Sequence, residues 1–260
     1  MKILNGEAIL GDCFEKLKEI PSESIDMIIT SPPYDNLRTY GGNLQWDFEG
    51  IAKEIFRVTK DGGVCVWVVG DSTEKFCESM TSFKQALFFK EIGFNLLDTM
   101  IYFKQNYAPA YPTLRRYANQ FEYMFVFSKG KPKTFNPIQK YKARNKEEKV
   151  GFRQQDGTII RKIKEKGRET KDASNVWEYA VAGGNKTGHP AVFPEKLAQD
   201  HILSWSNEGD IVLDPFAGSF TTAVACENTN RKWICIEKEQ NYFDIGINRI
   251  NNLKENEIND

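Results

Sequence analysis

The chain has 260 residues, 40% of them hydrophobic and 27% charged, and its formal net charge is −1. This length and composition predict one good-sized α/β domain with an insertion, and the absence of an 18-residue apolar run argues against a membrane span. Five cysteines without CxxC spacing, two histidines and no apolar signal sequence predict a reduced, cytoplasmic protein without a metal site.

Seven short apolar runs along the chain are typical of strands. In chain order they lie near residues 7–10, 25–29, 64–69, 95–103, 121–127, 211–214 and 232–236. Helical periodicity separates most of them, at residues 14–20, 48–56, 83–92, 220–227 and 243–253. This alternation predicts a doubly wound, mostly parallel sheet of seven strands with helices on both faces. The runs at 95–103 and 121–127 lack a helix between them, so we expect them to pair antiparallel.

Residues 129–186 interrupt this alternation, because they are polar, basic and short of apolar periodicity. Residues 129–171 carry 15 Lys and Arg against five Asp and Glu, a net charge of +10, whereas the rest of the chain carries −11. We predict a main domain formed by residues 1–128 and 187–260, with residues 129–186 inserted into it. Charge alone favours a polyanion-binding insertion and a solvated loop equally.

The loop after the strand at 211–214 is suited to a nucleoside-type cofactor. It reads Asp214-Pro215-Phe216-Ala217-Gly218-Ser219, and its small residues let a ligand approach the amino end of the next helix. Glu237 follows the next strand, about 20 residues on, where a carboxylate can accept hydrogen bonds from ribose hydroxyls. Because the loop lacks GxGxxG, S-adenosylmethionine fits better than a dinucleotide, with Asp214 near its amino-acid end. The alternative is an ordinary strand–helix turn with a surface glutamate.

A second loop, Ser31-Pro32-Pro33-Tyr34, comes after the strand at 25–29. Its prolines supply carbonyl acceptors without backbone donors, and Ser31 adds a hydroxyl acceptor. Such a loop can accept both hydrogens of an exocyclic amino group, through Ser31 Oγ and the Pro32 carbonyl, which frees the nitrogen lone pair for attack. Tyr34 supplies a flat face for stacking on a base flipped out of a duplex. The alternative is a proline-rich connector with a buried tyrosine.

The two loops together resemble the DNA amino-methyltransferases. The segment from Ile29 to Tyr34, which reads ITSPPY, is similar to the catalytic motif IV of that family. The loop from Asp214 to Ser219 is similar to its cofactor motif I, and Glu237 falls at motif II. The catalytic motif precedes the cofactor motif, with the basic insertion between them, as in the β group of these enzymes. The resemblance covers nearly the whole chain.

This resemblance implies a circularly permuted class I methyltransferase fold, in which the strands ending at Ile29 and Asp214 are neighbours and Ser31 and Gly218 share one crevice. It implies S-adenosylmethionine as the methyl donor, double-stranded DNA as the substrate and residues 129–186 as the target-recognition region. The catalytic residues would be Ser31, Pro32, Pro33 and Tyr34. The cofactor contacts would be Asp12, His189, Pro190, Phe193, Asp214, Phe216, Ala217, Gly218, Ser219 and Glu237. A cognate restriction endonuclease and a homodimer are further expectations.

One residue departs from the pattern of the family. The cofactor loop of these enzymes usually reads FxGxG, and Phe220 replaces the second glycine here. We expect Phe220 to narrow the cofactor pocket or to cap the sulfonium side. The substitution keeps open a hypothesis from another class, an inactive DNA-binding module that uses the basic segment alone.

The identity of the acceptor is a separate question. Ser31 at the first position of the tetrapeptide, with Thr30 before it, looks more like the cytosine-N4 subgroup, and adenine-N6 is the alternative because those enzymes share the same tetrapeptide. An RNA or protein amide methyltransferase is a rival, although such enzymes usually place the cofactor motif first. The sequence therefore predicts a site-specific DNA amino-methyltransferase, with cytosine-N4 as the favoured target.

Overall fold

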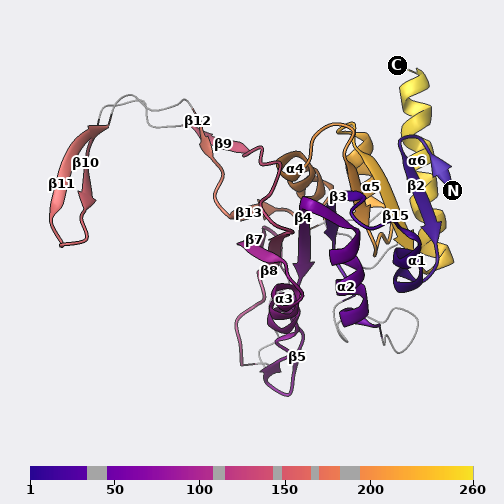
Figure 1. Cartoon of the computed structure of the whole chain (residues 1–260), viewed down its shortest axis with the longest axis horizontal. Coiled ribbons are helices and arrows are strands. Elements are labelled where there is room, and N and C mark those ends of the chain that lie inside the picture. The colour runs from indigo at the N-terminus through magenta and orange to yellow at the C-terminus, as the bar shows by residue number, and fades with distance from the viewer. Residues whose placement is uncertain (34–45, 108–114, 143–147, 165–169, 182–193, 260) are drawn as a thin grey trace. The chain divides into compact units, whose positions relative to one another are not determined.

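A computed structural model describes residues 1–33, 46–107, 115–142, 148–164, 170–181 and 194–259. The chain forms two compact units, Met1–Asn136 with Asn175–Asp260, and Pro137–Ser174. The first unit is built around one large sheet with helices on both of its faces (Figure 1). Within the described ranges, every helix is too short or too polar to serve as a membrane span.

The strands of the large sheet come from both ends of the chain. They are β1 (Lys2–Ile3), β2 (Gly6–Leu10), β3 (Ile25–Thr30), β4 (Thr59–Val69), β7 (Asn95–Lys104), β8 (Phe121–Ser128), β13 (Val176–Tyr179), β14 (Ile211–Asp214) and β15 (Lys232–Glu237). Their order across the sheet is β1-β2-β15-β14-β3-β4-β8-β7-β13. The five strands from β2 to β4 in this order run parallel, and β8 pairs antiparallel with β4 and β7. The predictions of a mostly parallel sheet and of an antiparallel pair at 95–103 and 121–127 are confirmed.

Strands β14 and β15 lie between β2 and β3, although they are more than 170 residues away from β3 in the sequence. β14 is parallel to β3 on one side, and β15 is parallel to β2 on the other. This is the permuted arrangement expected from the order of the two motifs. It places the ends of β3 and β14 next to each other at the centre of the sheet.

The described part of the sheet has nine strands, so the predicted number of seven is corrected. The sequence missed β1, which has two residues, and β13, which lies within the segment predicted as an insertion. Strand β13 alternates strictly, with Trp177 and Tyr179 buried and Val176 and Glu178 exposed. Four residues are too few for that alternation to stand out in a basic segment. The second compact unit is accordingly narrower than residues 129–186.

Six helices are described, three on each face of the sheet (Figure 1). On one face lie α1 (Cys13–Glu19), α2 (Phe48–Val58) and α3 (Thr81–Glu91), and on the other α4 (Glu195–Trp205), α5 (Thr221–Glu227) and α6 (Gln240–Asn259). The sequence predicted all of them except α4. That helix buries the polar residues Asp200, His201 and Ser204, so it lacks a clear apolar periodicity.

The core lies on both faces of the central strands. In β4, Cys65, Trp67 and Val69 belong to the core beneath α1, α2 and α3, while Val66 and Val68 are buried on the other face. Burying a valine side chain contributes about 1.5–3 kcal/mol, which makes a strand that is buried on both faces favourable. This explains why parallel central strands read as continuous apolar runs.

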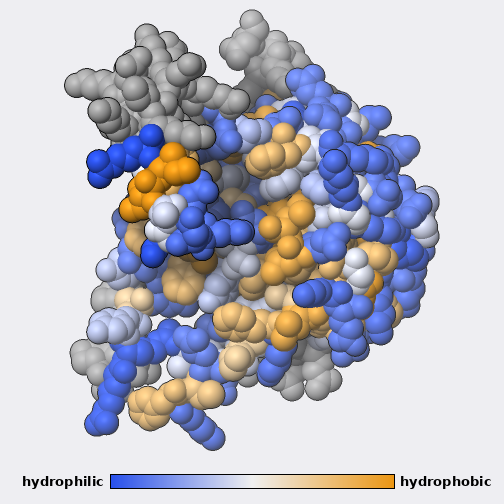
Figure 2. All heavy atoms as spheres, turned by 60° about the vertical axis from the view of Figure 1, so that its left-hand side comes forward, coloured by the Kyte–Doolittle hydropathy of each residue, from blue (hydrophilic) through white to orange (hydrophobic). Residues whose placement is uncertain are grey.

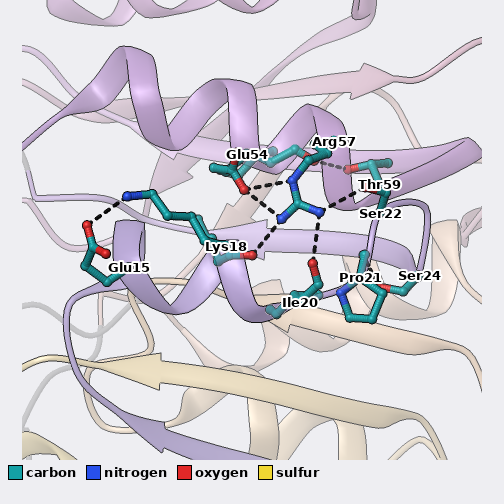
Figure 3. Close-up of polar contacts among 11 residues, drawn as sticks. Glu15, Lys18, Ile20, Pro21, Ser22, Ser24, Glu54, Arg57 and Thr59 are labelled. Carbon is teal, nitrogen blue, oxygen red and sulfur yellow. Dashed lines mark hydrogen bonds and ion pairs between the residues drawn. The ribbon is translucent and has the colours of Figure 1, made fainter.

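Arg57 of α2 joins the first two helices and the loop that leads into β3 (Figure 3). Its guanidinium donates hydrogen bonds to the carbonyls of Leu17 (2.8 Å) and Ile20 (2.9 Å) and forms an ion pair with Glu54 (2.6 Å). These carbonyls belong to the end of α1, where Leu17 also accepts from the N–H of Ile20 (3.1 Å) and Pro21, which follows, has no N–H to donate. Arg57 therefore fixes the start of β3, the strand that leads to the predicted catalytic loop.

The second unit consists of two antiparallel strand pairs. β9 (Gln139–Lys142) pairs with β12 (Thr170–Asp172), and β10 (Glu148–Arg153) pairs with β11 (Ile159–Lys164). The turn between β10 and β11 is held by Asp156, whose carboxylate accepts hydrogen bonds from the backbone N–H (2.9 Å) and the hydroxyl (2.7 Å) of Thr158. These bonds lower the pKa of Asp156.

Candidate active site

The two sequence motifs follow the carboxyl ends of two adjacent parallel strands at the centre of the sheet. We call the side of the sheet where these strands end its catalytic edge. Thr30, the last residue of β3, donates a hydrogen bond from Oγ1 to Oδ1 of Asp214, the last residue of β14, over 2.6 Å. The loop that begins at Ser31 and the loop that begins at Pro215 therefore start side by side. The prediction that these two strands are neighbours is confirmed.

Asp214 is a buried carboxylate, with 1% of its surface exposed. Besides Thr30, it accepts hydrogen bonds from Thr222 Oγ1 (2.6 Å) and from the backbone N–H of Phe216 (3.1 Å). Burial raises the pKa of Asp214 to about 6, and the three hydrogen bonds oppose this rise. These bonds hold β3, β14 and α5 together. Oδ2 accepts only one of them and can accept a further donor, so the predicted contact of Asp214 with the cofactor stays a prediction.

The predicted catalytic loop is described as far as Pro33. Ser31 and Pro33 are partly exposed, and Pro32 between them is buried. The prolines have no N–H, so the acceptors of this loop do not compete with local backbone donors. Tyr34 lies outside the described residues, so its predicted stacking role stays a prediction.

Gly218 and Glu237 form the centre of the predicted cofactor site. Gly218 has φ of +51°, a left-handed conformation that favours glycine, and its N–H donates to Glu237 Oε2 over 2.8 Å. The backbone N–H of Glu239 donates to Oε1 over 2.8 Å, and the N–H of Ala217 donates to the Ile236 carbonyl over 3.0 Å. Burial raises the pKa of Glu237. Its oxygens still have lone pairs for further donors, because each accepts one of these bonds.

Asp12 lies at the same edge, beyond the end of β2. The backbone N–H of Gly11 donates to the Glu237 carbonyl over 2.9 Å, which brings the ends of β2 and β15 together. Asp12 is exposed and caps α1 by accepting a hydrogen bond from the N–H of Phe14 over 3.0 Å. Its other oxygen lies 3.6 Å from Lys238 Nζ. Two carboxylates from neighbouring strands thus border the loop at Gly218.

Helix α6 supports the cofactor loop from behind through Arg249. Its guanidinium donates to the carbonyl (2.5 Å) and the hydroxyl (3.1 Å) of Ser219 and to Thr221 Oγ1 (3.2 Å). The same guanidinium lies 3.6 Å from Glu195 at the start of α4. Ser219 is 2% exposed, so its predicted cofactor contact would be made by its backbone.

The cofactor loop contains Phe216 and is followed by Phe220. The two rings pack on opposite sides, Phe216 toward α2 and Phe220 toward α6. The ring of Phe216 packs on Trp46, with ring centroids 5.3 Å apart, and belongs to the core beneath α2. Phe220 is fully buried and packs edge-on against Phe243 of α6, at 5.6 Å.

The expectation that Phe220 lines or caps the pocket is therefore corrected. Its ring fills the space over Gly246, where an added Cβ would lie 2.4 Å from the ring. The φ of Phe220 is +61°, which accounts for the glycine that the family usually has at this position.

Three of the predicted cofactor residues, His189, Pro190 and Phe193, lie outside the described residues. Helix α4 begins shortly after them, at Glu195. Their contacts with the methionine part of the cofactor stay predictions.

Sequence reasoning missed Thr222 and Arg249 and used Thr30 only as a hint to the target base. The available signal for Thr30 was a threonine at the end of one apolar run and an aspartate at the end of another. Arg249 carried no signal, because it comes from a helix 30 residues after the loop that it supports.

The residues at this edge fit S-adenosylmethionine. The carboxylates of Asp12 and Glu237 are acceptors suited to ribose hydroxyls, and Gly218 lets a ligand approach the backbone. Phe216 adds an aromatic side chain to the same loop, and the sheet ends there, where open α/β sheets bind their ligands.

Comparisons with known proteins agree with this site. A family model described as DNA methylase, of the N6/N4 type, matches residues 25–248. The orphan methyltransferase M.BamHII from Bacillus amyloliquefaciens is 48% identical over 256 residues, covering 94% of this chain and 91% of its own. The crystal structure of the M1.HpyAVI–SAM complex matches with a TM-score of 0.62 at 25% identity, covering 94% of this chain and 99% of that one. The cytosine-N4-specific PvuII DNA methyltransferase shares the fold, with a TM-score of 0.70 at 23% identity over 95% and 87% of the two chains.

The chain belongs to the N6/N4 DNA methylase family. It is therefore a DNA methyltransferase, and S-adenosylmethionine is its cofactor. Its α/β fold with a mostly parallel sheet is the fold of the solved methyltransferases that it matches.

Proposed function

We propose that this enzyme methylates the N4 amino group of cytosine at a specific site in double-stranded DNA, after flipping the base out of the helix. The observation that carries the proposal is the hydrogen bond between Thr30 and Asp214, which starts the catalytic and the cofactor loops side by side. Ser31 at the first position of the SPPY loop, with Thr30 before it, supports cytosine over adenine. Adenine-N6 is the alternative target within the same family.

The residues of the Ser31 loop would hold the amino group. Ser31 Oγ and the Pro32 carbonyl accept its two hydrogens, which directs the nitrogen lone pair away from the ring. Tyr34 stacks on the flipped base. Bound S-adenosylmethionine supplies the methyl group, and the residues that would hold it are Asp12, His189, Pro190, Phe193, Asp214, Phe216, Ala217, Gly218, Ser219 and Glu237. Asp214 positions the two loops.

Direct transfer to the nitrogen, without a covalent enzyme adduct, fits four of the five cysteines of the chain. Cys65, Cys226 and Cys235 are buried, and burial raises the pKa of each thiol well above its usual range. The pKa of Cys13 is raised to about 12 for the same reason. A thiol nucleophile needs a lowered pKa and access to the substrate, so these four cysteines are unsuited to that role.

We also propose that residues 129–186 contain the target-recognition region. The net charge of +10 over residues 129–171 suits a phosphate backbone. In the β10–β11 hairpin, Phe152 is paired with Ile160 and Arg153 with Ile159, and all four side chains are exposed. A two-stranded ribbon of this kind fits the major groove of DNA. A homodimer and a partner endonuclease stay predictions; M.BamHII is described as an orphan enzyme.

Replacing Ser31 with alanine tests the proposed catalytic loop. We expect Ser31→Ala to lower the methylation rate about 100-fold or more, because one acceptor of the amino hydrogens is lost, with S-adenosylmethionine affinity unchanged. The measurements are nucleoside mass spectrometry of modified DNA and calorimetry with the cofactor. Mass spectrometry of the wild-type product also distinguishes N4-methylcytosine from N6-methyladenine.

Ser24→Ala is the matched control, because Ser24 directly precedes β3 whereas Ser31 directly follows it. It should methylate DNA as the wild type does. Full activity in Ser31→Ala would show that Ser31 has no catalytic role. N6-methyladenine as the wild-type product would show that the target is adenine and not cytosine.

A further inference from the structure

A short hairpin follows β4 at the same edge of the sheet as the catalytic loop. It consists of β5 (Thr73–Glu74) and β6 (Cys77–Glu78), which pair antiparallel. Because β3 and β4 are parallel neighbours, with Thr30 opposite Trp67, both strands deliver the chain to that edge. In Figure 1 the hairpin lies at the end of the first unit toward which the β4 arrow points.

The tip of this hairpin is a strained turn that carries an exposed aromatic ring. Lys75 and Phe76, its two central residues, have φ of +50° and +66°. Both angles are typical of a type I′ turn, which strongly prefers Asn-Gly because other side chains are strained there. Phe76 is 77% exposed, more than any other phenylalanine of the described chain. A strained turn with an exposed large apolar residue suggests a functional rather than a structural role.

Asp71 anchors the base of the hairpin. Its carboxylate accepts hydrogen bonds from Ser79 Oγ (3.1 Å), from the Ser82 N–H (2.9 Å) and from the Ser82 hydroxyl (2.5 Å). The backbone N–H of Ser79 donates to the Ser72 carbonyl over 2.9 Å, and Arg116 bonds the hydroxyl of Thr73. The hairpin is therefore fastened to the end of β4 and to the start of α3, which holds its tip in place relative to the catalytic edge.

We propose that Phe76 is a wedge that enters the base stack of the DNA when the target base is flipped out. This inference rests on the proposed function. Flipping leaves a gap in the stack, and apolar side chains such as phenylalanine can separate base steps and hold them apart. Phe76 stands on the same edge as the Ser31 loop, where the flipped base would be received.

The residues around Phe76 favour stacked bases over the phosphate backbone as its contact. The hairpin carries two acidic residues, Glu74 and Glu78, and one cation, Lys75. With Arg116 bonded to Thr73, it offers phosphates no net positive charge. At the lower end of the face drawn in Figure 2, where the hairpin lies, apolar and hydrophilic side chains are exposed side by side. A second copy of the chain is the other occupant that an exposed phenylalanine would suit, and the test separates the two.

The test compares a normal target with one that needs no opening. Sequencing of DNA methylated by the wild type first defines the recognition site. Duplexes are then made with the target base paired, or opposite an abasic site, where flipping costs less. We expect Phe76→Ala to lower the single-turnover methylation rate about tenfold or more on the paired duplex, and less than about threefold on the abasic one. Phe76→Leu should keep most of the rate on both.

Three further measurements complete the test. Leu87→Ala, at an exposed site on α3 (69%), is the matched control and should match the wild type on both duplexes. The affinity for S-adenosylmethionine should be unchanged in every variant. A fluorescent base analogue at the target position should brighten with the wild type and less with Phe76→Ala.

The proposal is overturned by an equal loss of rate on both duplexes, by no loss on either, or by a change of oligomeric state that accounts for the loss. If the wild type transfers no methyl group to DNA, the proposed function fails and the wedge fails with it. If the wild type methylates DNA and Phe76→Ala is equally fast on both duplexes, the proposed function stands and only the wedge is overturned.

Discussion

Asp214 shows how one buried side chain can set the geometry of a whole site. Its carboxylate binds the hydroxyls of Thr30 on β3 and of Thr222 on α5, both over 2.6 Å. A buried carboxylate without these partners would be costly, because its charge would be desolvated without compensation. Losing the Thr30 bond would remove a hydrogen bond that joins the ends of β3 and β14, where the two loops begin. We therefore regard Asp214 as a positioning residue.

Replacing Asp214 with asparagine should change how stability depends on pH. The pKa of Asp214 is raised from 3.8 to about 6 by burial, so between these values the folded chain binds more protons than the unfolded chain. The stability contributed by this group is then full below pH 3.8 and is lost as the pH rises through about 6. Asp214→Asn should lack this loss.

Urea unfolding of both proteins at pH 4.5 and pH 8 measures the effect. We expect the free energy of unfolding of Asp214→Asn, relative to the wild type, to improve by about 1–3 kcal/mol between the lower and the higher pH. A relative stability that is the same at both pH values would show that the Asp214 carboxyl titrates at its ordinary pKa in the folded chain.

At the scale of the elements, the cofactor loop is held by helices that follow and precede it in the chain. Arg249 of α6 binds the backbone of Ser219 and also lies next to Glu195 of α4. Phe220 packs on α6 from the same loop, opposite Gly246. The left-handed Phe220 is therefore tolerated because burial of its ring against α6 offsets a backbone strain of about 1–2 kcal/mol.

Replacing Arg249 should weaken cofactor binding indirectly, because Arg249 supports the cofactor loop. We expect Arg249→Met to raise the dissociation constant for S-adenosylmethionine about tenfold, because hydrogen bonds from a charged group to the Ser219 carbonyl contribute about 1.5–3 kcal/mol. Calorimetry measures the affinity. Arg153→Met, in the β10–β11 hairpin, is the control and should bind the cofactor as the wild type does. An unchanged affinity in Arg249→Met, with the fold intact by circular dichroism, would contradict the supporting role of Arg249.

The elements differ in how well their sequence predicts them. Strand β3 could be predicted because it is buried on both faces and reads as an apolar run. Helix α4 could not, because it buries Asp200 and His201 through contacts with distant residues such as Tyr179 and Met124. The direction in which the Phe220 ring points could not be predicted from the sequence either, because it depends on the space over Gly246 of α6. Local patterns therefore gave the strand ends and their loops, whereas the support of those loops depended on tertiary packing.

At the scale of the whole molecule, charge and chain order divide the protein in the same way. Residues 129–171 carry a net charge of +10, while the rest of the chain carries −11. The chain enters and leaves the second unit at Pro137 and Ser174. An acidic body would by itself repel DNA, so binding would depend on the inserted segment.

Replacing residues 137–174 with a short Gly-Ser linker tests this division. We expect the shortened chain to bind S-adenosylmethionine with unchanged affinity, because β14, β15 and α6 are retained, and to lose methylation of DNA. Calorimetry and a methylation assay measure the two. In the full chain, DNA affinity should fall steeply with added salt, as expected when several phosphates are neutralised. Normal DNA methylation by the shortened chain would show that residues 137–174 are not needed for binding the DNA substrate.

The insertion of β14 and β15 between β2 and β3 has a consequence for biosynthesis. The middle of the sheet stays open until residues 211–237 have left the ribosome, and contacts between such distant segments form slowly. The nascent chain contains the SPPY segment long before it contains the cofactor loop that would hold the methyl donor. Until β14 and β15 are made, β2 and β3 each have an unpaired edge that can pair with other chains, so chaperone binding to the nascent chain would be advantageous.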